Sequence, residues 1–434
     1  MSTTSVPYTV RVLVTESGER MPLLIETATG QPLFDPTIFT VSQPRTRNLA
    51  SATIEQILRA IMVLLLFCKK SNIDLRVRML EGKIFDLSEL DRLSMFCRLP
   101  LEEIRRQVAD NQAKKIANIR SFPAEKVRMS NTKNKNKINE INKDGFVIRL
   151  LYIREYIEWL AKEKILKLSY TDPVRAALES CLTIATAVIN GKISHKTEHS
   201  DDPRFGLDTQ ALEFFKGIIN PEIADKPWRT KHGIQRNTLM MQWFLRLGLR
   251  RGELAGIKVG DIDFQENLVN VHRRADDKKD PRLIQPNAKT NARALPLDED
   301  LAQLTREYVS GSRRNNRGAR RHGFLFVATG TGAPIALRTI NSVFEVLRKR
   351  WPDVFDDFSP HVIRHTFNDE FSRYCEENNI NLIQAEEDRK ELNGWSPKSK
   401  QPGRYTKRST RKRTQAVSLK LQKKIVIKKG EKEV

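Results

Sequence analysis

Residues 246–263 read RLGLRRGELAGIKVGDID. They follow a predicted helix over 235–248 and precede the segment 262–297, whose alternating apolar residues predict β-structure. Glu253 lies three residues after Arg250, about one helical turn away, where a carboxylate can orient the arginine side chain. Taken alone, Arg250 at this corner is better explained as a residue that closes the helix after Gly248. The rest of the chain decides between the two interpretations.

The composition bounds the class of protein. A chain of 434 residues predicts two or three domains, and a hydrophobic content of 39% is enough for globular packing. The formal net charge of +23 and the pI of about 9.9 indicate a polyanionic partner. Nucleic acid is the first candidate and an anionic membrane surface the second.

No segment predicts a membrane span or a secretory signal. The most apolar run, AIMVLLLFC at 60–68, is short and favours a buried helix. The four cysteines are scattered, without metal-ligand spacing or a disulfide framework, and we interpret them as reduced thiols of a cytoplasmic protein. They are Cys68, Cys97, Cys181 and Cys375.

The first half of the chain predicts a β-rich arm and then a helical domain. Within residues 8–42, apolar and polar residues alternate in YTVRVLV and in TIFTVS, and turn residues lie between these two runs. Residues 1–45 are therefore predicted to form a small β-rich arm. Residues 46–190 predict an all-helical domain with basic surfaces. The polar stretch 191–206 is the predicted linker. The predicted helices of the first half begin near 51 and cover 87–112, 145–165 and 172–190.

The second half predicts a mixed helical and β domain. Its predicted helices are 208–219, 235–248, 298–310, 337–350, 361–378 and 380–392. Three further stretches of this half stand out beside 246–263. They are AKTNARALPL at 288–297, SPHVIRHTF at 359–367 and LNGWSPKSKQPGRYTKR at 392–408.

Together these four stretches resemble the tyrosine recombinase (phage integrase) family. The first resembles the family's G-L-R-x-x-E-L motif, and 359–367 resembles its H-x-x-R motif. The stretch 288–297 resembles the hairpin that carries a catalytic lysine, and 392–408 resembles the His/Trp and tyrosine motif. The resemblance covers roughly 207–415, and for 46–190 it rests only on helical character and position.

The resemblance implies a clamp of two arginines on a DNA phosphate. Attack on a phosphodiester develops negative charge on the non-bridging oxygens, and guanidinium groups match two such oxygens at once. Arg250 and Arg364 are expected in this role, with Glu253 supporting the first. Arg251 is the rival for the first position, and its spacing to Glu253 fits less well.

Proton transfer needs further groups. Lys289 is the expected general acid for the leaving sugar oxygen, with Lys278 and Lys279 as alternatives because the hairpin is long. His361 can deprotonate the tyrosine or hold a phosphate oxygen. Trp395 takes the His/Trp position, where its indole N–H can donate to phosphate, although a packing role competes.

Tyr405 is the expected nucleophile. It lies in QPGRYTKRSTRKR at 401–413, where no acidic residue interrupts the basic side chains, and neighbouring cations favour a phenolate. It follows Trp395 by ten residues, one more than the commonest spacing in the family. Tyr374 precedes the tryptophan and is interpreted as a packing residue. His365 is interpreted as a helix residue with satisfied hydrogen bonds.

The resulting expectation is a multidomain DNA-breaking and rejoining enzyme. The all-α N-terminal domain and an α+β catalytic domain over 207–415, mainly helical with a small antiparallel sheet, would form a C-shaped clamp on duplex DNA, followed by a basic tail at 416–434. The reaction would pass through a 3′-phosphotyrosyl link, for integration, excision or transposition of a mobile element. Two alternatives are a type IB topoisomerase and a non-catalytic accessory DNA-binding protein. An RNA-binding protein would rest on charge alone.

The expected partners and cofactors follow from the same resemblance. The partner is double-stranded DNA, bound by four copies of the chain, with accessory proteins as further candidates. No metal, cofactor or membrane is expected. The protein is expected in the cytoplasm, associated with the nucleoid.

Overall fold

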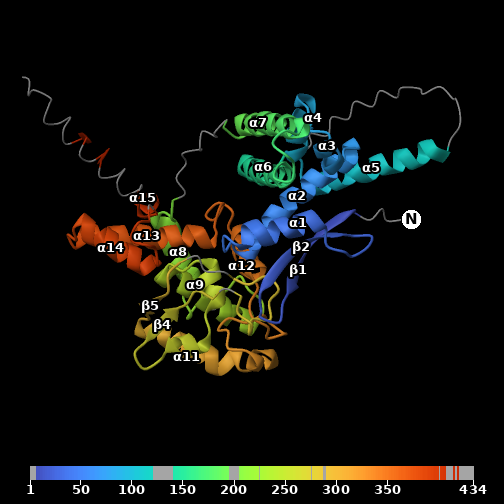
Figure 1. Cartoon of the computed structure of the whole chain (residues 1–434). Helices are drawn as coiled ribbons and strands as arrows, with labels where there is room; N and C mark the ends of the chain where they lie inside the picture. The colour runs from blue at the N-terminus through green and yellow to red at the C-terminus, as the bar shows by residue number, and fades with distance from the viewer. Residues whose placement is uncertain are drawn as a thin grey trace, which may run out of the picture. The chain divides into compact units, whose positions relative to one another are not determined.

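The structure is a computed structural model that describes most of the chain (Figure 1). The described residues are 6–120, 140–194, 205–223, 225–274, 276–286, 290–399, 401–406, 414–415 and 418–419, without the side chains of 111–120, 194, 404 and 405. The chain divides into two units. One is built mainly from the residues up to Ser200 and the other mainly from Asp201 onward.

The N-terminal unit is a helical bundle with one hairpin. Its elements are β1 (Tyr8–Val14), β2 (Arg20–Glu26), α1 (Phe34–Thr40), the π-helix η1 (Val41–Arg45), α2 (Ser51–Ser71), α3 (Leu75–Leu80), α4 (Leu87–Cys97), α5 (Leu101–Arg120), α6 (Lys143–Ile165) and α7 (Pro173–Ser194). The long helix α2 packs against α4, α5, α6 and the hairpin. The predicted helical character of this part of the chain is confirmed, but the single helix predicted over 87–112 is wrong, because α4 ends at Cys97 and α5 begins at Leu101 after Pro100.

The hairpin contributes to the same core as the helices. Strands β1 and β2 pair antiparallel, and Leu24 of β2 is fully buried. Phe39 of α1 packs edge-on against the ring of Tyr156 in α6, at a centroid distance of 5.3 Å. The segment that precedes α2 is therefore packed onto the helical unit through apolar side chains.

The prediction of a strand at 37–42 is wrong, because Phe34–Thr40 forms α1 and Val41–Arg45 forms η1. The alternation of TIFTVS suggested a period of two, but the buried residues are Pro36, Phe39 and Thr40. That spacing of three and four residues matches a helix, and proline is tolerated in a first helical turn.

One helix of the described residues is long and apolar enough to cross a membrane by length and composition. It is α2, and 61% of its apolar window is buried inside the protein. Ile54, Ile61 and Leu64 of this helix are fully buried in the core of the unit.

The C-terminal unit is mainly helical and holds a small sheet. Its elements are α8 (Thr209–Ile219), α9 (Lys231–Leu247), α10 (Arg251–Gly256), the 3-10 helix η2 (Val259–Asp261), β3 (Ile262–Asp263), β4 (Leu268–Val271), β5 (Arg293–Pro296), α11 (Glu299–Tyr308), the π-helix η3 (Val309–Arg313), the 3-10 helix η4 (Arg317–Arg321), α12 (Leu337–Arg350), α13 (Pro360–Glu377), α14 (Leu382–Asn393) and α15 (Pro402–Tyr405). The strands form an antiparallel sheet in the order β3-β4-β5. The predicted mixture of helices and a small antiparallel sheet is confirmed.

The core of this unit lies around α9, which packs against α8, α11 and α13. Trp243 and Phe244 of α9 are fully buried, and Val269 and Leu295 bring the sheet onto the same core. Because α9 is held on several sides, the corner at its C-terminal end is fixed in place.

Candidate active site

The corner after α9 depends on a glycine in the left-handed conformation. Gly248 ends α9 with φ +58°, and a Cβ there would lie 2.3 Å from Cδ1 of Phe367 on α13. The lack of a side chain thus lets α9 and α13 approach closely. The carbonyl of Gly248 accepts a hydrogen bond of 2.5 Å from Nη1 of Arg364.

Arg250 follows this corner as the N-cap residue of α10. Its backbone N–H donates to Oε2 of Glu253 at 2.9 Å, and its Nη1 donates to Oε1 of the same residue at 3.3 Å. Nη1 also lies 3.5 Å from the carbonyl oxygen of Asn393. About a third of the Arg250 side chain (32%) is exposed, so the guanidinium is both oriented and accessible.

The rival Arg251 is engaged elsewhere. Its Nη1 donates to Oδ1 of Asn341 on α12 at 2.6 Å. This contact ties Arg251 to a packing partner, whereas Arg250 shares its partners with Arg364. The geometry therefore favours Arg250 as the first arginine of the candidate site.

Arg364 reaches the same place from α13. Only 1% of its side chain is exposed. Besides the Gly248 carbonyl, it donates from Nη2 to the carbonyl of Asn393 at 3.3 Å. Its guanidinium carbon lies 5.6 Å from the ring centre of Trp395. Two arginines from distant parts of the sequence thus converge on one backbone oxygen at the end of α14.

Glu253 is the buried acid between the arginines, and none of its side chain is exposed. Its carboxylate accepts from Nη2 of Arg293 at 3.0 Å and from the hydroxyl of Thr290, and lies 3.9 Å from Nη1 of Arg364. Burial by itself raises the pKa of a carboxyl, but Arg293, Arg364 and the Thr290 hydroxyl outweigh it and lower the pKa of Glu253 from 4.5 to about 2. We call Glu253 with Arg250, Arg293 and Arg364 the arginine centre.

Removal of this carboxylate is expected to destabilise the fold. Glu253→Ala leaves the buried guanidinium groups of Arg293 and Arg364 without their acid, at a cost of about 3 to 5 kcal/mol of unfolding free energy. Urea titration measures the loss, and the exposed pair formed by Glu213 provides the control Glu213→Ala, which should change little. An equal effect of the two variants would contradict the buried pairing.

The free energy of unfolding should also depend on pH through the carboxyl group of Glu253. Because the pKa of Glu253 is lower in the folded protein, its contribution is complete above about pH 4.5 and is lost as the pH falls towards 2.

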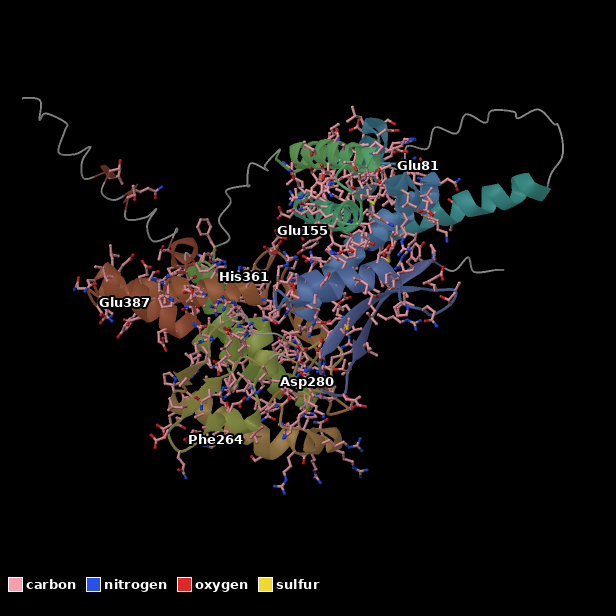
Figure 2. All side chains as sticks on the ribbon, in the orientation of Figure 1. Glu81, Glu155, Phe264, Asp280, His361 and Glu387 are labelled. Carbon is pink, nitrogen blue, oxygen red and sulfur yellow. The ribbon has the colours of Figure 1, made fainter. Side chains whose placement is uncertain are left out.

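His361 lies exposed in the first turn of α13 (Figure 2). Its Nε2 is 3.3 Å from Nε2 of His365, and the two rings meet edge-on at a centroid distance of 4.6 Å. One imidazole must donate and the other accept in such a contact. His365 is buried, so His361 is the histidine of this pair that faces solvent.

Trp395 follows the end of α14 and is 7% exposed. The preceding Gly394 has φ +63°, and a Cβ there would lie 2.9 Å from the carbonyl oxygen of Asn291. The N–H of Asn291 donates to the carbonyl of Gly394 at 2.9 Å. This close approach fixes the residues before β5 against the end of α14.

The backbone that carries Tyr405 lies beside the same helices. It belongs to α15, which packs against α13 and α14. The side chain of Tyr405 is outside the described residues, as are Lys289 and the basic residues 407–413. The structure therefore brings together Arg250, Glu253, Arg364 and Trp395, and places the helix of Tyr405 against their supporting elements.

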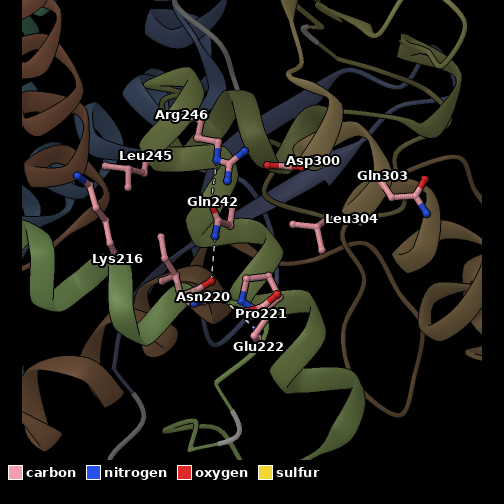
Figure 3. Close-up of a pocket in the computed structure, with 11 residues that line it drawn as sticks. Lys216, Asn220, Pro221, Glu222, Gln242, Leu245, Arg246, Asp300, Gln303 and Leu304 are labelled. Carbon is pink, nitrogen blue, oxygen red and sulfur yellow. Dashed lines mark hydrogen bonds between the residues drawn. The ribbon is translucent and has the colours of Figure 1, made fainter.

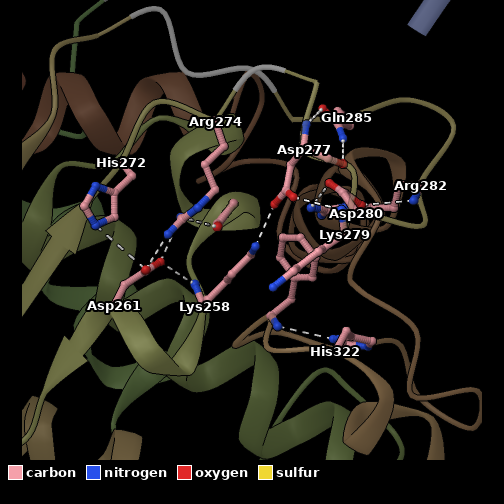
Figure 4. Close-up of polar contacts among 12 residues, drawn as sticks. Lys258, Asp261, His272, Arg274, Asp277, Lys279, Asp280, Arg282, Gln285 and His322 are labelled. Carbon is pink, nitrogen blue, oxygen red and sulfur yellow. Dashed lines mark hydrogen bonds and ion pairs between the residues drawn. The ribbon is translucent and has the colours of Figure 1, made fainter. Parts of the chain in front are cut away.

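Lys278 and Lys279, the alternative lysines, lie exposed in the connection between β4 and β5. Figure 4 shows Lys279 beside Asp277 and Asp280 of this connection. This connection is anchored at several points. Asp277 pairs with Nζ of Lys258 at 2.6 Å, and Arg282 pairs with Asp280 at 2.7 Å and donates to the carbonyl of Ala255 at 2.9 Å.

Two members of the candidate site were missed in the sequence. Arg293 is buried and Asn393 offers its carbonyl to both arginines. For Arg293 a signal exists, since strand alternation places it on the same inward face as Leu295, and a buried charge needs a partner. A backbone carbonyl such as that of Asn393 leaves no signal in the sequence.

A separate cavity of about 740 Å³ lies between α8, α9 and α11 (Figure 3). Lys216, Gln242, Arg246 and Asp300 are among its lining residues, and none of the candidate site residues lines it. Within the described ranges, no group of three or more His, Cys, Asp or Glu side chains could hold a metal ion.

Comparison with known proteins gives consistent matches to one family. Residues 223–400 match the phage integrase family. The chain is 24% identical over 174 residues to the tyrosine recombinase XerC of Lacticaseibacillus casei (strain BL23), covering 40% of this chain and 50% of that protein. It is 30% identical over 132 residues to the transposase from transposon Tn916 of Enterococcus faecalis, covering 28% of this chain and 32% of that protein. The chain thus spans half or less of the length of these relatives.

The chain is also similar to solved structures of other proteins. One is the Tn1549 transposon integrase in complex with transposon right end DNA, at 18% identity and a TM-score of 0.35, covering 65% of this chain and 90% of that chain. Another is the XerH site-specific recombinase bound to a palindromic difH substrate, at 14% identity and a TM-score of 0.39, covering 84% and 95%.

Proposed function

Because residues 223–400 belong to the phage integrase (tyrosine recombinase) family, we propose that this protein breaks and rejoins duplex DNA at specific sites. The observation that carries the proposal is the arginine centre. Arg250 and Arg364 come from α10's N-cap and from α13, and both donate to the carbonyl of Asn393, two residues before Trp395. Such a paired arrangement of arginines suits a phosphate with two charged oxygens.

The arginines would act on the transition state. As the nucleophile adds, negative charge grows on the non-bridging oxygens, and guanidinium groups held in advance stabilise it without reorganising. Arg250 is accessible and Glu253 holds it from one side. Arg364 is largely covered, so it would present its remaining edge to a phosphate seated beside Trp395.

Tyr405 would be the nucleophile. Its phenol oxygen bonds to phosphorus while the bond from phosphorus to the 5′ oxygen breaks, which gives a 3′-phosphotyrosyl link and a free 5′-hydroxyl. Lys289 would protonate the leaving 5′ oxygen, and His361 would accept the phenolic proton or hold a phosphate oxygen. Trp395 would donate its indole N–H to phosphate.

The second half of the reaction is the reverse of the first. The 5′-hydroxyl of a partner strand attacks the phosphotyrosine and releases Tyr405. The phosphodiester energy is kept in the covalent link, so the scheme uses no ATP and assigns no step to a metal. Exchange of two duplexes would use four copies of the chain, with each N-terminal helical unit and catalytic unit clamping the DNA. Integration, excision or transposition of a mobile element is the proposed role, in the cytoplasm at the nucleoid.

Two alternatives share parts of this evidence. A type IB topoisomerase would use the same chemistry, but it would relax supercoiled DNA with little site preference. A non-catalytic accessory protein would bind DNA and form no covalent link. The residue types at the candidate positions, including both arginines and Tyr405, favour an active enzyme over the accessory role.

Binding to DNA is expected to weaken steeply with salt. The net charge of +23 indicates many lysine and arginine contacts to phosphates, each of which releases counterions. For six to ten phosphate contacts, the affinity should fall about 10³-fold or more between about 50 and 200 mM salt. Fluorescence anisotropy over a salt series measures the slope, and an affinity independent of salt would contradict the clamp.

Covalent trapping tests the proposed function. The protein is incubated with end-labelled duplexes that cover the DNA flanking its own gene, with a nick near each candidate position so that a cleaved end diffuses away. A slow band on a denaturing gel that protease removes is expected. Salt-sensitive binding without such a band would favour the accessory role, and relaxation of any supercoiled plasmid would favour the topoisomerase.

A further inference from the structure

Arg293 is a buried cation for which the proposed reaction scheme has no use. It is the first residue of β5, and 1% of its side chain is exposed. A fully buried arginine needs a charge partner and saturated hydrogen bonds, or its burial is costly. The contacts of Arg293 therefore indicate which groups it holds in place.

The guanidinium of Arg293 bridges two elements of the candidate site. Nη2 and Nη1 donate to the two carboxylate oxygens of Glu253 at 3.0 and 3.4 Å. Nε donates to the carbonyl of Leu392 at 2.8 Å. One planar group thus joins the acid of α10 to the last turn of α14, which a lysine could not do with the same geometry.

The last turn of α14 offers three successive carbonyl oxygens to this centre. Leu392 accepts from Arg293, Asn393 accepts from Arg250 and Arg364, and Gly394 accepts from the N–H of Asn291. The carbonyls at the end of a helix have no partner within the helix and carry its partial negative charge. Three arginines are therefore assembled by one helix end, immediately before Trp395.

We infer that Arg293 is a positioning residue for strand cleavage, which holds Glu253 so that Arg250 and Arg364 are oriented towards the scissile phosphate. The inference rests on the proposed function. Arg293 donates to both oxygens of Glu253, at 3.0 and 3.4 Å, and so supplies charge that the acid would otherwise draw from the other two arginines, of which Arg250 keeps its contact with Oε1 at 3.3 Å. Without Arg293, Glu253 would remain as a buried carboxylate whose nearest cations are Arg250 at 3.3 Å and Arg364 at 3.9 Å, and it would draw them away from the phosphate.

The chain offers a matched control. Arg282 also has a mostly buried side chain and pairs with Asp280 at 2.7 Å (Figure 4). It also donates to the carbonyls of Ala255 and Ile335. It lies in the same connection between β4 and β5, and these partners of Arg282 are not members of the arginine centre. Arg282→Met therefore removes a similar pair without the proposed effect on Arg250 and Arg364.

The test compares cleavage of two substrates by Arg293→Met and Arg282→Met. The rate of covalent adduct formation is measured at saturating DNA, on a duplex with a normal scissile phosphate and on one with a neutral methylphosphonate at that position. Arg293→Met should cleave the duplex with the normal phosphate about tenfold or more slowly than wild type. The substitution would misplace Arg250 and Arg364, and loss of one such donor lowers the cleavage rate by more than about tenfold. The DNA dissociation constant should stay within about twofold, and the loss should shrink on the methylphosphonate, which develops less charge.

The loss in cleavage rate on the phosphate, divided by the loss on the methylphosphonate, separates an effect on positioning from an effect on folding. Arg293→Lys, which keeps a charge beside Glu253 but loses the fork, should fold and show a smaller loss with the same substrate dependence. The inference is overturned if either Arg293 variant cleaves the phosphate like wild type, or if both substrates slow by one factor, as expected for Arg282→Met. Absence of any wild-type adduct would instead overturn the proposed function, and this inference with it.

Discussion

Replacing Tyr405 with phenylalanine is expected to remove covalent adduct formation, by more than about 10³-fold, while DNA binding stays unchanged. The substitution deletes only the phenol oxygen that would bond to phosphorus. The backbone of α15, which packs against α13 and α14, has no reason to change, because phenylalanine keeps the ring. Adduct yield on a nicked duplex and anisotropy on the intact duplex measure the two properties separately.

Tyr374 supplies the control for this experiment. It lies on α13, the helix of His361 and Arg364. The packing role predicted for Tyr374 is wrong, because 59% of it is exposed. Tyr374→Phe should form the adduct at the wild-type rate. An adduct that persists in Tyr405→Phe would mean that another group is the nucleophile, and a loss in Tyr374→Phe alone would identify that group.

Replacing Arg364 with alanine is expected to have the next largest effect on cleavage. Loss of one pre-positioned donor to the transition state costs about 10² to 10³-fold in rate. DNA affinity should change only a few fold, because the side chain is 1% exposed and makes a small share of the phosphate contacts. The rate of adduct formation at saturating DNA and the dissociation constant measure these effects.

Arg364→Ala also removes hydrogen bonds to the carbonyls of Gly248 and Asn393, so a control for stability is needed. Arg313 is another buried arginine of this unit, and it donates to the carbonyls of Phe324 and His322. Arg313→Ala should lower the melting temperature but leave cleavage by the folded protein near the wild-type rate. Equal cleavage losses in the two variants would show that the effect of Arg364 is structural.

Short-range features of the candidate site could be predicted from the sequence. Gly248, Arg250 and Glu253 lie within six residues, and the contact between Arg250 and Glu253 at 3.3 Å follows from their helical spacing. The order of helices and the small sheet followed from apolar periodicity in the same way. The strand prediction at 37–42 is wrong because a short apolar run fits both periods, whereas the buried residues Pro36, Phe39 and Thr40 follow the helical period.

The long-range part of the site could not be predicted in this way. Arg293 meets Glu253 and the Leu392 carbonyl across 40 and 99 residues of sequence, and such partners are set by how β5, α10 and α14 pack. The shared acceptor at Asn393 is a backbone atom, which any residue would provide. The roles of Lys289 and of the Tyr405 side chain stay predictions, since both lie outside the described residues.

In the proposed function, Tyr405 of the C-terminal unit becomes linked to DNA. The most direct measurement is to isolate the wild-type protein–DNA adduct, digest both components and identify the modified peptide by mass spectrometry. The proposed function predicts a nucleotide joined through phosphate to the oxygen of Tyr405. A link to any other residue, or an adduct that hydroxylamine cleaves as an acyl phosphate, would contradict it.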